Sequence, residues 1–219
     1  MDIKVCGMSE QYLRVILGVG EQVIGEPDVM VAATKKIDVI GTFAEDNENT
    51  ENIFIGREAN SELILAPSIP GNVYVVKCEQ DTTYTILKHS LFARTKNIDV
   101  KKKYNTYGHF EYILASGQGF LCFSAFGEAY EIKLDGQQSF VFDDSHILGW
   151  ENSLEVESVK VDIDQKTSIT DDKSLEVNFE HGNLSGEDLV LKFSGKGKVY
   201  FCTRNKDVYL KELVNSKGK

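Results

Sequence analysis

The chain has 219 residues, 42% of them hydrophobic and 26% charged, so it is long enough to bury a sizeable core and is ordinary in composition for a soluble globular protein. Its formal net charge of −10 opposes binding to nucleic acids and anionic membranes, because phosphate groups would be repelled. No run of about eighteen apolar residues occurs, so we expect no transmembrane segment.

The first residues, MDIKVCGMSEQ, contain neither a basic region followed by an apolar one nor an Arg-rich amphipathic leader. We therefore expect a cytoplasmic protein. The four cysteines are far apart in the sequence and form no CxxC pair, and the last three lie in strand-like runs. We interpret Cys6, Cys78, Cys122 and Cys202 as buried, reduced thiols of a reducing compartment.

Short apolar runs bounded by glycine, proline and aspartate begin at Tyr12, and their length and turn residues are typical of β-strands. The first such runs are residues 12–17, 23–24, 29–33 and 37–40. The acidic stretch EDNENTEN at residues 45–52 has no apolar residue and is expected to be an exposed loop.

This layout recurs along the chain. Residues 29–39 align with residues 90–100 and with residues 146–156, and a feeder strand precedes each copy at residues 13–17, 73–77 and 129–134. Residues 116–123 resemble residues 194–201, and residues 62–66 fill the same slot in the first copy. Self-similarity at roughly sixty residues indicates three copies of one β unit, at about residues 11–70, 71–127 and 128–204. A single copy would leave an apolar face open, so we expect the three to share one core within one all-β domain over residues 1–219.

Two further segments stand out near the end of the chain. In residues 159–183 apolar and polar residues alternate at period two, which predicts an added hairpin with one solvated face. In the tail, residues 205–219, Tyr209, Leu210, Leu213 and Val214 share one helical face behind a possible cap at Asn205, which predicts one short helix.

Four motifs in order along the chain resemble those of a known family. They are Gly20-Glu21-x-x-x-x-Glu26-Pro27-x-x-Met30-Val31, Leu65-Ala66-Pro67-Ser68-Ile69-Pro70-Gly71, Leu121-Cys122-Phe123-Ser124-Ala125-Phe126-Gly127 and Leu189-Val190-Leu191-Lys192-Phe193-Ser194-Gly195-Lys196-Gly197. With them the chain resembles bacterial-type members of the altered-inheritance-of-mitochondria twenty-four family, whose fold is similar to the tryptophan RNA-binding attenuation protein (TRAP). The resemblance implies triplicated short β-helix or sandwich units and a ring-like oligomer, and it implies no activity. Residues 45–52 depart from the family's glycine-rich loops, and residues 159–183 from its short connection.

The most polar cluster is Asp143-Asp144-Ser145-His146, where two carboxylates and an imidazole could form a metal or acid/base site. Polar residues also gather at the aligned positions of the other copies, 26–29 and 87–90, so a turn between two strands explains all three. His109 and His181 stand apart from other metal-ligating residue types, and the chain contains no GxSxG, Walker or HExxH motif. We therefore predict no catalytic residue, no metal site and no cofactor.

Three other features allow a functional and a structural interpretation. Gly117-x-Gly119 and Gly195-x-Gly197 precede strands rather than helices, so we interpret them as turn glycines and not as phosphate-binding loops. Lys101, Lys102 and Lys103 with Tyr104 and Tyr107 could bind a single-stranded nucleic acid, or the lysines could keep an edge strand from pairing. The net charge favours the second interpretation. Trp150 aligns with Ala33 and Arg94 and either fills a gap between units or anchors an interface.

These observations favour a non-catalytic β scaffold that self-associates and binds another protein. Three linked units still leave outer strands at both ends of the array, and a closed ring removes such edges, so we expect a homo-oligomer and favour a trimer. Residues 159–183 could instead cover an edge and leave a monomer. The alternative function is a TRAP-like module that binds single-stranded nucleic acid or a small ligand. An enzyme would need a convergent polar site, which the sequence does not show.

Overall fold

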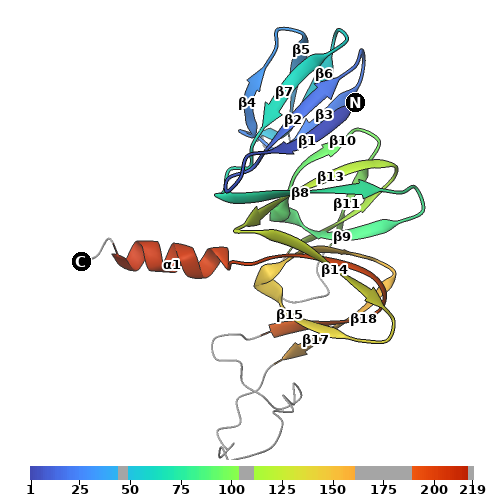
Figure 1. Cartoon of the computed structure of the whole chain (residues 1–219), viewed down its shortest axis with the longest axis vertical. Helices are drawn as coiled ribbons and strands as arrows, with labels where there is room; N and C mark the ends of the chain where they lie inside the picture. Colours follow the sequence, from blue (N-terminus) through green and yellow to red (C-terminus); the bar gives the residue numbers. More distant parts are fainter. Residues whose placement is uncertain (44–48, 104–110, 161–188, 217–219) are drawn as a thin grey trace, which may run out of the picture.

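The computed structural model describes residues 1–43, 49–103, 111–160 and 189–216. The chain is all-β with one short helix, as the sequence predicted, and its strands are stacked along one long axis from the N-terminal to the C-terminal part (Figure 1). In chain order the strands are β1 (Asp2–Cys6), β2 (Tyr12–Leu17), β3 (Gln22–Gly25), β4 (Met30–Ala33), β5 (Ile37–Phe43), β6 (Asn49–Gly56), β7 (Ser61–Leu65), β8 (Gly71–Cys78), β9 (Thr83–Leu87), β10 (Leu91–Thr95), β11 (Asp99–Lys103), β12 (Tyr112–Ser116), β13 (Gly119–Phe126), β14 (Ala129–Asp135), β15 (Phe140–Asp143), β16 (Ile147–Glu151), β17 (Leu154–Lys160) and β18 (Leu189–Cys202). Two 3₁₀ turns, η1 (Lys88–Ser90) and η2 (Asp144–His146), and the helix α1 (Lys206–Ser216) complete the described elements.

Three sheets carry these strands, and all the strand pairs in them are antiparallel. The first sheet has the order β1-β2-β7-β4, the second β5-β6-β3-β10-β13-β8, and the third β11-β12-β9-β16-β18-β14. The N-terminal half of β18 also pairs with β15 and β17, so this one strand takes part in four ladders.

Two strand pairs join consecutive thirds of the chain. β3 pairs with β10, where Ile24 lies opposite Arg94, and β9 pairs with β16, where Thr85 lies opposite Trp150. The second and third sheets therefore each continue across a boundary between thirds, and backbone hydrogen bonds tie the stack together.

The same irregularity occurs in three strand pairs. The ladder between β4 and β7 skips Val31, the ladder between β10 and β13 skips Phe92, and the ladder between β16 and β18 skips Leu148. A bulge leaves one residue out of the ladder and bends the strand. Val31, Phe92 and Leu148 are thus comparable in structure, and they are also the residues that the sequence comparison aligned.

The buried apolar residues form three clusters, and not the single shared core that we expected. One cluster draws on the first and second sheets, one on the second and third, and one on the third sheet with β15 and β17. The inner sheets are covered on both faces, which explains why β13 reads as a nearly continuous apolar run. Trp150 is buried in the last cluster, with its ring centroid 5.2 Å from that of Tyr112 and 5.4 Å from that of Phe193. It fills a core and does not lie on an exposed surface.

The predicted helix is present, and its cap is the predicted one. The side-chain oxygen of Asn205 accepts a hydrogen bond from the backbone N–H of Val208 at 3.1 Å. Tyr209 stacks against Phe126 at the end of β13, with 4.9 Å between the ring centroids. Beyond this contact α1 points away from the sheets (Figure 1).

Two expectations need correction. Part of the acidic stretch at residues 45–52 is strand and not loop, because β6 begins at Asn49 and pairs with β5. β1 was not expected, although its sequence DIKVC alternates polar and apolar residues. Beyond Lys160, the predicted hairpin at residues 159–183 lies outside the described residues, as do Tyr104, Tyr107, His109 and His181.

Gly71 links the first third of the chain to the second. Its carbonyl accepts a hydrogen bond from the backbone N–H of Gln11, and the next residue, Asn72, donates its N–H to the carbonyl of Gly127. Gly71 has a φ of +142°, and a Cβ at this position would collide with the carbonyl oxygen of Ala125. Only glycine fits here without a shift of the backbone.

We expect Gly71→Ala to lower the free energy of unfolding by about 2–4 kcal/mol, because it adds a steric collision to an unfavourable φ. Gly20→Ala is the matched control, since Gly20 also has a positive φ (+78°) but has no atom within 4 Å of the added Cβ. It should cost only about 1 kcal/mol. Urea unfolding of both variants measures the difference, and equal losses would contradict the steric argument.

Glu26 follows β3 at the first junction and donates its backbone N–H to the carbonyl of Phe92 at 2.9 Å. Burial raises the pKa of its carboxyl to about 7, Glu51 adds to this increase, and Lys206 and Lys88 oppose it. The unfolded chain loses this proton near pH 4.5, whereas the folded chain keeps it up to about pH 7. The free energy of unfolding therefore falls as pH rises through this window.

Glu26→Gln should remove this decrease in the free energy of unfolding, because glutamine does not titrate. We expect the variant to be more stable than the wild type at pH 8 by about 1–2 kcal/mol, after allowance for solvent screening, and to be nearly equal to it at pH 4.5. Thermal unfolding between pH 4.5 and pH 8 checks this. Glu79→Gln, at an exposed position, should leave the pH dependence unchanged.

Candidate interaction surface

Several strands have one edge without a partner among the described residues, and two of them, β4 and β15, lie at opposite ends of the stack (Figure 1). Among the described residues β4 pairs only with β7, and β15 pairs only with β18. The strands at the corresponding places inside the stack have partners on both edges, since β10 lies between β3 and β13, and β16 lies between β9 and β18. The free edges of β4 and β15 are therefore at the positions where a further junction of the kind formed by β3 with β10 and by β9 with β16 would lie.

The exposure of the bulge residues shows the same difference. Phe92 and Leu148 are 1% and 4% exposed, whereas Val31 in β4 is 63% exposed. All four residues of β4 are exposed, including Met30. Apolar side chains that are buried at both internal junctions are thus open to solvent at the N-terminal end of the stack.

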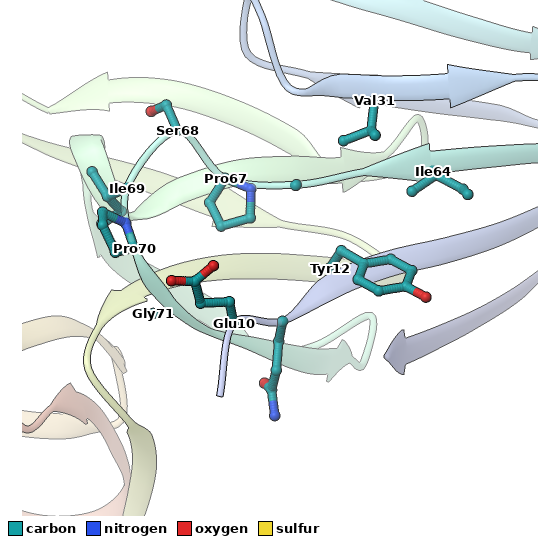
Figure 2. Close-up of a pocket in the computed structure, with 11 residues that line it drawn as sticks. Glu10, Tyr12, Val31, Ile64, Pro67, Ser68, Ile69, Pro70 and Gly71 are labelled. Atoms are coloured by element: carbon teal, nitrogen blue, oxygen red, sulfur yellow. The ribbon is translucent and has the colours of Figure 1, made fainter. Parts of the chain in front are cut away.

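A groove of about 540 Å³ lies beside this strand (Figure 2). Val31 lines it together with Tyr12 from β2 and Ile64 from β7, and the linker of residues 66–71 forms the opposite wall. The lining is mostly apolar, and Glu10 and Gln11 also line the groove.

The outer face of the first sheet carries one charged pair. Arg14 Nε donates to Glu62 Oε1 at 2.6 Å, and this hydrogen bond and the positive charge lower the pKa of the Glu62 carboxyl. Leu13 and Leu63, which point to the other face, are buried in the core. The strands β2 and β7 thus present a face of mixed apolar and charged side chains next to the groove.

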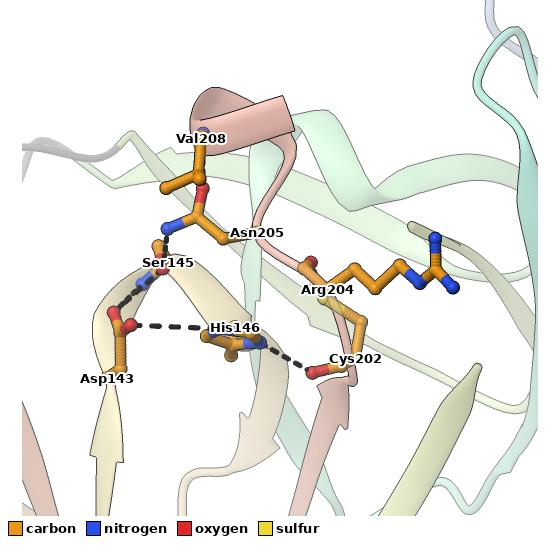
Figure 3. A network of polar contacts seen from close by, with 7 residues as sticks. All are labelled: Asp143, Ser145, His146, Cys202, Arg204, Asn205 and Val208. Carbon is orange, nitrogen blue, oxygen red and sulfur yellow. Dashed lines mark hydrogen bonds and ion pairs between the residues drawn. The ribbon is translucent and has the colours of Figure 1, made fainter. Parts of the chain in front are cut away.

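The other free edge ends in a network of hydrogen bonds (Figure 3). At the end of β15, Asp143 Oδ1 accepts from the backbone N–H of Ser145 at 2.9 Å and from its hydroxyl at 2.8 Å. Asn205 Nδ2 donates to the same hydroxyl oxygen at 2.7 Å. His146 Nδ1 lies 2.9 Å from the carbonyl oxygen of Cys202, which can only accept, so this nitrogen carries the hydrogen.

The structure places the Asp143-Asp144-Ser145-His146 cluster in this turn, as the structural interpretation predicted. Asp143 and His146 approach each other, with 3.7 Å between Oδ2 and Nε2, and Asp144 is buried. In the part of the chain that the structure describes, no three His, Cys, Asp or Glu side chains gather in a way that could hold a metal ion. The four residues cap a turn and meet the base of α1.

The other sequence candidates lie apart from this network. Lys101 is in β11, at the edge of the third sheet, and its ammonium lies 3.5 Å from Asp99. Gly117, with a φ of +120°, lies in the turn between β12 and β13, as predicted. Gly195, with a φ of +91°, lies within β18, so its prediction as a turn glycine was wrong. No helix among the described elements begins near them.

The expectation of buried thiols holds for three of the four cysteines and is wrong for Cys6, which is partly exposed. All four are free thiols, and Cys78, Cys122 and Cys202 are buried. Burial raises the pKa of Cys78 to about 12 and raises that of Cys122 as well. A thiol must lose its proton to act as a nucleophile, so these two thiols are inert at neutral pH.

The sequence did not reveal the groove or the link from Ser145 to Asn205. The linker with Pro67 and Pro70 was visible as a motif, but nothing in the motif shows that it lines a groove together with Val31. Ser145 and Asn205 are distant in sequence, and only the pairing of β15 and β16 with β18 brings them together. No helix in the described part of the chain is long and apolar enough to cross a membrane.

Comparison with known proteins agrees with the fold. The chain is similar to the crystal structure of a Streptococcus pyogenes protein from a structural genomics consortium, with a TM-score of 0.76 and 17% sequence identity over 98% of this chain and 99% of that one. At this identity the likeness shows the fold alone. No curated protein matches the chain.

A family model described as mitochondrial biogenesis AIM24 matches residues 3–204. The match spans the four motifs and all the described strands except the first residue of β1. The chain therefore belongs to the AIM24 family, the one that the motifs indicated.

Proposed function

We propose that the protein is a non-catalytic β scaffold that self-associates by joining β4 of one copy to β15 of the next. The observation that carries this proposal is Val31, which is exposed at the free end although its counterparts Phe92 and Leu148 are buried at the two internal junctions. A second copy would cover Val31 if its β15 paired with β4 in the way that β3 pairs with β10 inside the chain.

The internal junctions indicate the register of such a joint. At these junctions Ala93 lies opposite Gly25, and Gly149 lies opposite Ile86. Phe142 stands at the same spacing before β16 as Ile86 does before β10 and Gly25 before β4. The corresponding joint would place Ala32 of one copy opposite Phe142 of its partner.

β4 and β15 of one chain cannot meet, because they lie at opposite ends of the stack (Figure 1). The joint must therefore form between copies. It uses different surfaces on the two partners, so repeated joining gives either a closed ring or an open filament. We favour the ring, in which three copies of a chain with three TRAP-like β units, at about residues 11–70, 71–127 and 128–204, would place nine such units around one axis.

The rest of the proposal concerns partners and location. We propose that the assembly binds another protein in the cytoplasm, where its free thiols would stay reduced. Binding of single-stranded nucleic acid or a small ligand is the alternative. Thermal-shift measurements with oligonucleotides, amino acids and metal ions would distinguish it, and co-purification from the native host would identify a protein partner.

We expect light scattering at micromolar concentration to give a mass about three times 24.5 kDa. A mass of 24.5 kDa would contradict self-association. A mass that keeps growing with concentration would contradict the closed ring.

Val31→Lys should weaken the association about tenfold or more, because a charge at the joint would be buried without a partner. Val19→Lys is the matched control, since Val19 is 72% exposed in the turn between β2 and β3. Sedimentation equilibrium compares the two, and equal association constants would mean that β4 is not part of the joint. Thermal unfolding confirms that both variants fold.

A further inference from the structure

The free edge strand β15 is connected to the C-terminal helix by a short path of hydrogen bonds (Figure 3). The hydroxyl hydrogen of Ser145 goes to Asp143, so the oxygen of Ser145 is left to accept from Asn205 Nδ2. The other end of the same amide caps α1 through the N–H of Val208. One asparagine side chain thus holds both the first turn of the helix and the turn that ends β15.

Asp143 carries a charge at the end of β15, so its hydrogen bonds affect the proposed pairing of β15 with β4 of another copy. At the second internal junction the corresponding residue is Leu87, which is 1% exposed within a core cluster. At the first junction it is Glu26, whose pKa is raised by burial. A position that is buried at a joint tolerates a carboxylate only when hydrogen bonds satisfy it. For Asp143 the two groups of Ser145 supply these bonds, with His146 3.7 Å away.

The other two turns lack this arrangement. In the second turn, the hydroxyl of Ser90 donates to the carbonyls of Leu87 and Leu148 and is buried within the fold. In the turn after β3, the backbone N–H of Glu26 donates to the carbonyl of Phe92. The hydrogen bond from Asn205 to Ser145 joins the turn after β15 directly to the base of α1.

α1 itself is lightly attached. It has 11 residues, and a helix of this length is marginal without tertiary contacts. Tyr209 rests on Phe126, whereas Leu210, Leu213 and Val214 are 40% exposed or more. The bond from Asn205 to Ser145 is one of the contacts that hold the helix base to the body.

We propose that α1 positions the joining edge: when the helix is docked, Asn205 fixes Ser145, Ser145 satisfies Asp143, and β15 is ready to accept β4 of a second copy. When the helix base is released, the Asp143 carboxylate is free to face the edge. A charge facing an edge strand prevents pairing. This inference rests on the proposed self-association. In it, the docking of α1 controls whether β15 can pair with a second copy.

Asn205→Asp tests the link in the full-length chain. Aspartate caps a helix as well as asparagine does, but it cannot donate to Ser145 and it adds a negative charge near Asp143. We expect about a tenfold weaker association in sedimentation equilibrium and faster amide hydrogen exchange in Phe140–Asp143, with the helix retained in the circular dichroism spectrum. Ser145→Ala should have the same two effects. Lys211→Ala, an exposed change on α1, is the control and should have neither.

The two readouts separate this inference from the proposed function. If the wild type remains a monomer, self-association is wrong, and the hydrogen exchange of β15 still decides whether α1 fixes the edge. If the wild type assembles and Asn205→Asp has an unchanged association constant and unchanged exchange in β15, the inference is overturned. Faster exchange with unchanged association would also overturn it, because the edge would then pair whether or not the helix base holds it.

Discussion

The structure depends on the pairing of backbone groups at the edges of its sheets. An edge strand exposes a row of unpaired N–H and C=O groups, and these groups can form hydrogen bonds with another strand. Inside the chain this requirement is met by β3 with β10 and by β9 with β16, each of which makes one sheet out of two consecutive thirds. The second and third sheets each span two thirds of the chain because of these two junctions, and buried apolar clusters pack against them.

The junctions resemble each other in backbone but differ in side chains. Trp150, Arg94 and Ala33 each stand two residues after the residue left out of their ladder, in β16, β10 and β4. Trp150 is enclosed by aromatic rings, whereas Arg94 binds Glu51 through Nη2 at 3.0 Å. A common backbone frame therefore supports an apolar core in one place and an ion pair in another. Such differences make each junction distinct and limit exchange between them.

Much of the fold could be predicted from the sequence, because short runs bounded by glycine, proline and aspartate mark strands directly. The feeder strands, the helix with its Asn205 cap and the aligned residues Val31, Phe92 and Leu148 came from pattern alone. The number of cores could not, since an apolar run shows that a strand is buried but not which of its two faces meets which neighbour. The candidate surface was hidden for a related reason. Val31 reads as an ordinary strand residue, and only the missing partner of β4 shows that it is exposed.

β18 has a consequence for how the chain is made. In the first two thirds, separate strands serve neighbouring sheets, β6 and β7 in one case and β12 and β13 in the other. In the last third a single strand of 14 residues serves both, turning at Gly195 where φ is +91°. Among the described strands, β14, β15 and β17 pair with no strand except β18. On the ribosome these three emerge first and remain unpaired until β18, their partner, is synthesised. The nascent chain is thus most prone to misfold late in translation, when its earlier sheets can already have formed.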